Sequence, residues 1–275
     1  MRPPSGGVVL AAVDGSVEAA DGVDVAAELA RRWNADLHLV HVWSGLAPVL
    51  AGPVAEGAAR RLLADEAAAA VRRGAVVCRQ HFLVGSAAGC IAELGDELGA
   101  IVCVAGQHRH SQLGRLVFGS VAAELLGVTT RPLLLVSSSA NWPPRRVVVG
   151  DDGSHAALAA AALAADIAAL YGSDVELIRA DRSAGSDHAD IRDGVLEPSG
   201  PSDRTLLTSL PSVHTAVVPG SPTAVLTRDA DGLGTLVAVG SRQHGGLVRW
   251  LEGSVSLELV HTARTVLVVP VGDAG

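Results

Sequence analysis

The chain has 275 residues, of which 49% are hydrophobic and only 3% aromatic, and its formal net charge is −8. This length exceeds the usual domain of about 100–150 residues, and the negative charge argues against nucleic acid as the main partner. All 21 basic residues are arginine, which excludes a Walker-type phosphate lysine and a lysine Schiff base. No apolar run approaches the ~20 residues of a membrane span.

The first half alternates apolar runs, typical of buried strands, with alanine-rich stretches that favour helices. The predicted strands are residues 8–13, 37–43, a region broken by polar residues at 75–78 and 82–84, 101–105, and 131–136. The predicted helices begin at Ser16, span 55–73, and run from 85 to 98. Strands that alternate with helices predict right-handed crossovers and a parallel sheet.

The second half repeats this order. Asp14-Gly15-Ser16, which follows the first strand, returns as Asp152-Gly153-Ser154. In each half a glycine also ends the fourth strand, and a Gly-Ser pair follows at the same spacing: Gly106 with Gly119-Ser120, and Gly240 with Gly253-Ser254. A repeat at constant spacing indicates a duplicated domain. We therefore predict two domains, residues 1–139 and 140–275, joined by a polar, proline-rich link.

One segment breaks the repeat. Residues 181–211 are rich in Ser, Asp, Gly and Pro where the first half has its long alanine-rich helix, so we expect mostly loop with a short helix near 205–210. The predicted fold class is α/β, with two tandem Rossmann- or flavodoxin-like domains. Each domain is expected to be a five-stranded, mainly parallel sheet with helices on both faces.

Ligands of open parallel sheets bind at the carboxyl ends of the strands, so the residues after strands one and four are the first candidates. Asp14 and Asp152 can accept hydrogen bonds from a ribose or hold a metal bound to phosphate; the alternative is a turn-forming aspartate that serves nearby N–H groups. Ser16 and Ser154 are better explained as helix caps than as nucleophiles. Glycines after strand four let backbone N–H groups approach phosphate, and the following Gly-Ser opens a helix with a positive end.

These motifs resemble those of tandem universal stress proteins over essentially the whole chain. That family carries an ATP-binding pattern, G-x2-G-x9-G-[ST], after strand four, an aspartate at the end of strand one, and a small apolar residue after strand two beside adenine. The last position corresponds to Val42 and Ala180. In the second half only Gln243 departs from the pattern. In the first half Arg109 replaces the same glycine, and Ser111 and Gln112 stand where the second half has Gly245 and Gly246.

The resemblance implies a stress-response regulatory protein that binds ATP or AMP, either alone or together with Mg²⁺. The second half is favoured because it keeps more of the pattern. Arg109 can contribute a guanidinium to phosphate or fill the pocket, since a side chain in place of glycine hinders phosphate approach. The implied binding positions are Asp14, Val42, Gly106, Arg109, Gly119 and Ser120 in the first half and Asp152, Ala180, Gly240, Gln243, Gly253 and Ser254 in the second.

Two alternatives stay open, a nucleotide-free protein-interaction module with a degenerate ATP site and a weak ATPase. The sequence pattern supplies no general base, no nucleophile with its partner and no metal cluster, so we expect at most slow ATP hydrolysis; the protein partner is unknown. Three cysteines without a C-x-x-C pair indicate a reducing, cytoplasmic compartment. The family also implies that the last strands, 131–136 and 265–270, meet in an internal pseudo-dimer, with a homodimer of the whole chain as a further option.

Overall fold

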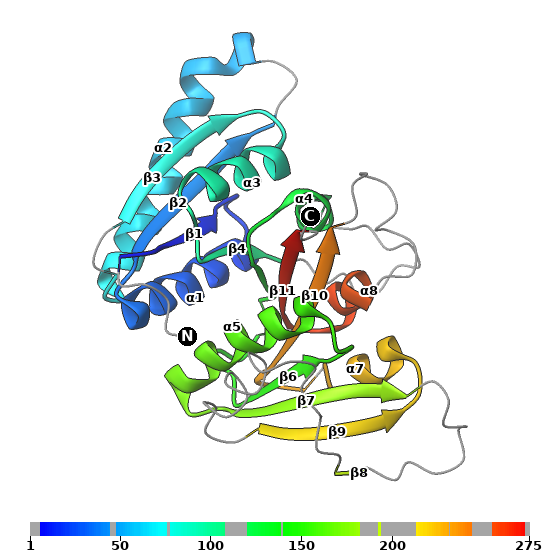
Figure 1. Ribbon diagram of the computed structural model, residues 1–275. Helices are drawn as coiled ribbons and strands as arrows, with labels where there is room; N and C mark the ends of the chain where they lie inside the picture. Colours follow the sequence, from blue (N-terminus) through cyan, green and yellow to red (C-terminus); the bar gives the residue numbers. More distant parts are fainter. Residues whose placement is uncertain are drawn as a thin grey trace. The chain divides into compact units, whose positions relative to one another are not determined.

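The computed structural model forms two compact units, residues 3–138 and residues 139–275 (Figure 1). It describes residues 6–44, 48–75, 78–107, 120–138, 140–181, 192–193, 213–230, 232–243 and 255–272.

The first unit is a parallel sheet with the strand order β3-β2-β1-β4-β5. Its elements are β1 Val8–Ala12, α1 Val17–Trp33, β2 Asp36–Trp43, α2 Pro48–Arg72, β3 Cys78–Val84, α3 Ala87–Glu97, β4 Val102–Gly106, α4 Ser120–Val128 and β5 Leu133–Val136. The expected break in the third strand is wrong, because β3 runs continuously from Cys78 to Val84. Arg79 and Gln80 are exposed on this outer strand, so their polar side chains do not interrupt it.

The second unit has the order β11-β10-β6-β7-β9-β8, in which only the two-residue β8 is antiparallel to its neighbour. Its elements are β6 Arg146–Gly150, α5 His155–Tyr171, β7 Asp174–Asp181, β8 Arg192–Asp193, β9 Val213–Pro219, α7 Pro222–Ala230, β10 Thr235–Gln243, α8 Val255–Thr262 and β11 Thr265–Gly272. Five parallel strands were expected, and β8 adds a short sixth at the edge. The short helix predicted near 205–210 lies outside the described residues.

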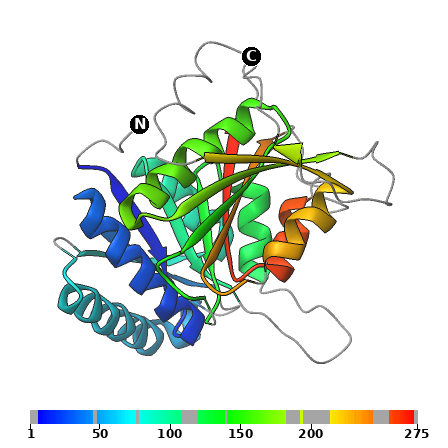
Figure 2. The same cartoon turned by 90° about the horizontal axis from the view of Figure 1, so that it is seen from below.

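Equivalent helices contact equivalent strands in the two units: α1 contacts β1 and β4, and α5 contacts β6 and β10. Helix α1 also lies beside α2, and α7 lies beside α8 (Figure 2). The capping roles predicted for the two serines are confirmed: Ser16 Oγ accepts a hydrogen bond from Ala19 N at 3.1 Å, and Ser154 Oγ accepts one from Ala157 N at 3.2 Å.

The glycine of the fourth strand is a point of close approach between helix and sheet. Gly106 ends β4, and a Cβ atom built there would lie 2.6 Å from the backbone nitrogen of Ala19 in α1. A Cβ atom built at Gly240 would overlap the backbone of Ala156 in α5. The expected glycine loop starting at Gly240 is wrong, because β10 continues to Gln243, which pairs with Gly272 of β11. Both glycines therefore make room for the first turn of a helix.

We predict that Gly106→Ala or Gly240→Ala lowers the free energy of unfolding by about 1–3 kcal/mol or more, because a helix backbone cannot move aside without shifting the whole first turn. The matched control is Gly57→Ala in α2, where an added Cβ meets no atom within 4 Å. That change should stabilise by about 0.4–1 kcal/mol. Urea unfolding followed by circular dichroism measures both effects, and equal stabilities for Gly240→Ala and the control would contradict the close approach.

A histidine pair joins β2 to β3 in the first unit. His38 Nδ1 and His81 Nε2 are 3.0 Å apart, the rings are stacked with centroids 5.0 Å apart, and His38 is buried. Burial lowers the pKa of both histidines; the charges of His81 and Arg79 lower that of His38 further, Asp36 opposes this, and Arg79 lowers that of His81. Two neutral rings can share one hydrogen, whereas two imidazolium rings would repel each other.

We predict that this pair makes the protein less stable in mild acid. The pKa of each histidine is lower in the folded protein than the ordinary 6.5, so the unfolded chain binds more protons and the free energy of unfolding falls as the pH drops below about 6.5. His81→Gln should reduce the loss of stability between pH 7 and pH 5 relative to the unaltered protein. Melting temperatures across this range test it; an unchanged pH dependence in His81→Gln would refute the prediction.

Candidate functional site

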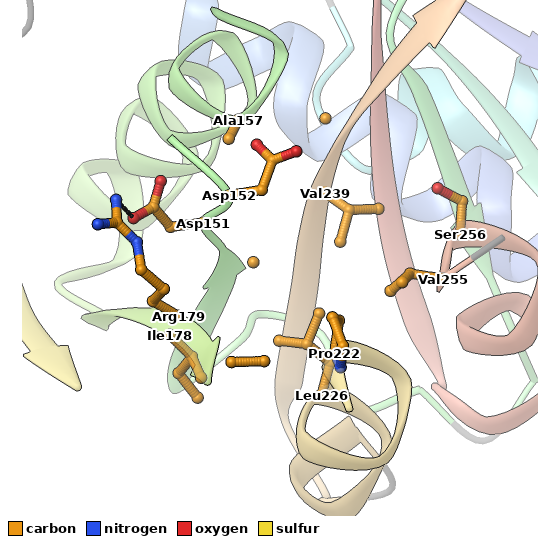
Figure 3. Close-up of a pocket in the computed structure, with 13 residues that line it drawn as sticks. Asp151, Asp152, Ala157, Ile178, Arg179, Pro222, Leu226, Val239, Val255 and Ser256 are labelled. Atoms are coloured by element: carbon orange, nitrogen blue, oxygen red, sulfur yellow. Dashed lines mark hydrogen bonds and ion pairs between the residues drawn. The ribbon is translucent and has the colours of Figure 1, made fainter. Parts of the chain in front are cut away.

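A cavity of about 330 Å³ opens at the carboxyl ends of β6, β7 and β10 in the second unit (Figure 3). Its lining combines apolar and polar side chains. The apolar side chains are Ile178, Ala180, Pro222, Leu226, Val239 and Val255. The polar ones are Asp151, Asp152, Arg179 and Ser256.

The structure brings three of the predicted second-half residues together at this cavity. Asp152 follows β6, Ala180 lies near the end of β7, and Gly240 lies in β10, and all three line the cavity. Gln243 is the last residue of β10. Gly253 and Ser254 lie outside the described residues. The next residue, Val255, begins α8 and lines the cavity, so the amino end of this helix faces the site.

Three of the first-half residues lie at comparable positions in their own sheet. Asp14 follows β1, Val42 lies in β2, and Gly106 ends β4. Ser120 begins α4, and both Arg109 and Gly119 lie outside the described residues.

The aspartate after the first strand has a turn-forming role in both units. Asp14 Oδ1 accepts hydrogen bonds from Ser16 N at 2.9 Å and from Ser16 Oγ at 2.6 Å. Asp152 Oδ1 accepts one from Ser154 N at 2.9 Å. Both residues are exposed, and a carboxylate offers about four lone-pair sites, so serving the turn does not exhaust it. Asp152 can thus hold its turn and still meet a ligand in the cavity.

An ion pair at the cavity was not found by sequence analysis. Arg179 Nη2 donates to Asp151 Oδ2, and Asp151 Oδ1 accepts a hydrogen bond from Gly153 N at 2.9 Å. The side chain of Asp151 is 8% exposed and that of Arg179 is 39% exposed. The available signal was the doubled aspartate, since the first half has Val13 in front of its single Asp14.

Helix α7 contributes Pro222 and Leu226, which the predictions also lacked. The signal for this helix is Ser221-Pro222, because Ser221 Oγ accepts a hydrogen bond from Ala224 N at 3.2 Å and proline suits the first helical position. The adjacent Gly150 keeps space for it: a Cβ at Gly150 would lie 2.8 Å from Leu226 Cδ1.

The sequence model of the universal stress protein family matches the chain twice, over residues 7–137 and again over residues 144–270. The chain belongs to the universal stress protein family. Its duplication and its α/β fold are thereby confirmed. Where the structure describes the chain, none of its helices has both the length and the apolar character needed to cross a membrane.

Solved universal stress proteins resemble this one in fold. One from Archaeoglobus fulgidus DSM 4304 is 17% identical, with 96% of this chain and 98% of that chain covered and a TM-score of 0.75. A putative universal stress protein from Pseudomonas aeruginosa UCBPP-PA14 is 18% identical over 96% and 92%, with a TM-score of 0.58. A third, from Archaeoglobus fulgidus in complex with dAMP, is 26% identical over 47% and 96%, with a TM-score of 0.39. The dAMP is a ligand of that protein.

Proposed function

We propose that this universal stress protein binds an adenine nucleotide, ATP or AMP, in its second unit and acts in the stress response by binding rather than by turnover. The observation that carries the proposal is the cavity itself. Three positions chosen from the sequence, Asp152, Ala180 and Gly240, come from separate strands and meet around one space. A concave, mostly apolar space with a few polar groups is the usual form of a small-molecule site.

The lining of the cavity suits the parts of a nucleotide. Its apolar residues, among them Ala180 and Leu226, suit a purine base. The carboxylate of Asp152 suits ribose hydroxyls, which donate hydrogen bonds to it. The amino end of α8 and the preceding Gly253-Ser254 suit phosphate, because that end of a helix carries exposed N–H groups and partial positive charge.

The charge of the cavity lining affects whether the site favours ATP or AMP. Among the described lining residues, Asp151 and Asp152 are acidic and Arg179 is basic, so this part of the site is net negative. The oxygens of a phosphate chain are ligands that Mg²⁺ prefers. When bound, Mg²⁺ would offset the charge of a triphosphate, whereas AMP needs less compensation. We therefore expect ATP affinity to rise with Mg²⁺ more than AMP affinity does.

The preference for the second unit rests on side chains of the phosphate pattern. The second half departs from it at Gln243 alone. The first half has Arg109 at that position, and it has Ser111 and Gln112 where the second half has two further glycines. A side chain at such a position hinders the approach of phosphate to the backbone. The proposal is for binding without efficient hydrolysis, since the Asp151 carboxylate is already paired with Arg179 and is not available to activate a water molecule.

We predict that Ala180→Phe lowers ATP affinity at least about tenfold, because the larger side chain fills the space proposed for the base. The matched control is Val42→Phe in the first unit. The two positions are equivalent because equivalent hydrogen bonds precede them. Val13 N donates to the oxygen of Val40, two residues before Val42, and Asp151 N donates to the oxygen of Ile178, two residues before Ala180. Isothermal titration with ATP and with AMP, each with and without Mg²⁺, gives the affinities, and melting temperatures report folding.

Other outcomes separate the alternatives. Loss of binding in Val42→Phe alone would move the site to the first unit. Mass spectrometry of small molecules released from freshly purified, denatured protein gives an independent test. If the intact chain neither releases nor binds an adenine nucleotide, the proposal fails and the nucleotide-free interaction module is the better description.

A further inference from the structure

We propose that Arg179 is a positioning residue of the second-unit site: through Asp151 it braces the turn that presents the Asp152 carboxylate to the ligand. The inference deepens the proposed function and rests on it. It concerns a residue outside the phosphate-binding pattern and outside the positions that the family resemblance implies.

The brace is a continuous chain of contacts from one strand to the next. Arg179, on β7, forms an ion pair with Asp151 Oδ2, directly after β6. The other oxygen, Oδ1, accepts the hydrogen bond of Gly153 N at 2.9 Å, and Asp152 Oδ1 accepts that of Ser154 N at 2.9 Å. Asp151 therefore holds the turn on both sides of Asp152. In Figure 3, Arg179 and Asp151 are joined by a dashed line, with Asp152 on the side of Val239.

The first unit holds the same two positions together with a histidine in place of the arginine and a backbone carbonyl in place of the carboxylate. His41 occupies the place of Arg179, and its Nδ1 lies 2.7 Å from the carbonyl oxygen of Val13, which occupies the place of Asp151. A single hydrogen bond to a backbone carbonyl is thus sufficient to link these strand ends. The second unit instead sets an ion pair there, with the Asp151 side chain only 8% exposed. The ionic version adds a second acceptor oxygen that reaches the turn itself.

The guanidinium geometry also indicates a role beyond stability. Among the residues that the structure describes, the buried Arg179 Nε has no hydrogen-bond partner, so the orientation that engages Asp151 leaves this donor unsatisfied there. Such a donor destabilises the fold, and a half-buried ion pair contributes little net stability. What the arrangement does secure is the direction of Asp151, and with it the turn that carries Asp152.

The experiment compares two ligands, ATP and 2′,3′-dideoxy-ATP, which lacks the hydroxyls assigned to Asp152. Isothermal titration is run on the full chain and on Arg179→Met and Arg179→Lys. We expect Arg179→Met to weaken ATP binding about fivefold or more while changing dideoxy-ATP binding by less than about twofold. Arg179→Lys keeps a cation for Asp151 and should restore most of the ATP affinity.

The matched control is Arg146→Met, which removes another arginine–carboxylate pair between the same two strands, Arg146 with Glu176. Arg146 begins β6 at the end opposite the cavity, so neither affinity should change. If Arg179→Met does not fold, Asp151→Asn breaks the same ion pair and should give the same selective loss. Melting temperatures accompany each titration.

The outcomes distinguish this inference from the proposed function. Failure of the unaltered protein to bind ATP would defeat both. If the unaltered protein binds ATP and Arg179→Met weakens both nucleotides equally, the positioning role is wrong and the binding function stands. Equal binding of ATP and dideoxy-ATP by the unaltered protein would also overturn the inference, because the Asp152 carboxylate would then have no hydroxyl to meet.

Discussion

The contact between a helix backbone and the glycine of the fourth strand is the constraint on which the rest of each unit depends. At Gly106 and Gly240 the first turn of α1 or α5 lies so close to the sheet that no Cβ fits. The capping serine and the aspartate before it belong to the short turn that enters this helix. Once the helix is seated, the aspartate is held at the carboxyl edge of the sheet. From the sequence we expected these glycines to let phosphate approach the backbone. In the structure they first make room for the backbone of the helix.

Much of the fold could be predicted because its signals are local. Apolar runs mark β1 and β6, and a serine followed by an alanine-rich stretch marks α1 and α5. The errors arise where distant residues decide. Strand β10 extends to Gln243 because Gly272 pairs with it, and that partner lies far along the chain. Strand β3 stays continuous through polar residues because it is the outermost described strand of its unit.

The candidate site divides in the same way. Asp152, Ala180 and Gly240 could be predicted to meet because the sequence places each near the carboxyl end of a parallel strand, although β10 runs on to Gln243, and such ends share one edge. The pairing of Asp151 with Arg179 could not, because it joins residues 28 positions apart through side chains whose directions only the folded sheet determines. Leu226 reaches the cavity through the placement of α7, which no local pattern specifies.

The two units therefore separate what the scaffold requires from what a site requires. Helix caps, the aspartate turn and the fourth-strand glycine occur in both. The link between the first two strand ends differs, with His41 bonded to the Val13 carbonyl in one unit and Arg179 paired with Asp151 in the other. A half-buried ion pair adds little stability over a single hydrogen bond, because desolvation offsets most of its Coulomb attraction. Its distinguishing effect is directional, since a guanidinium and a carboxylate restrict each other's orientation more than one hydrogen bond does. The unit that keeps more of the phosphate pattern is also the unit whose aspartate turn is held by charge.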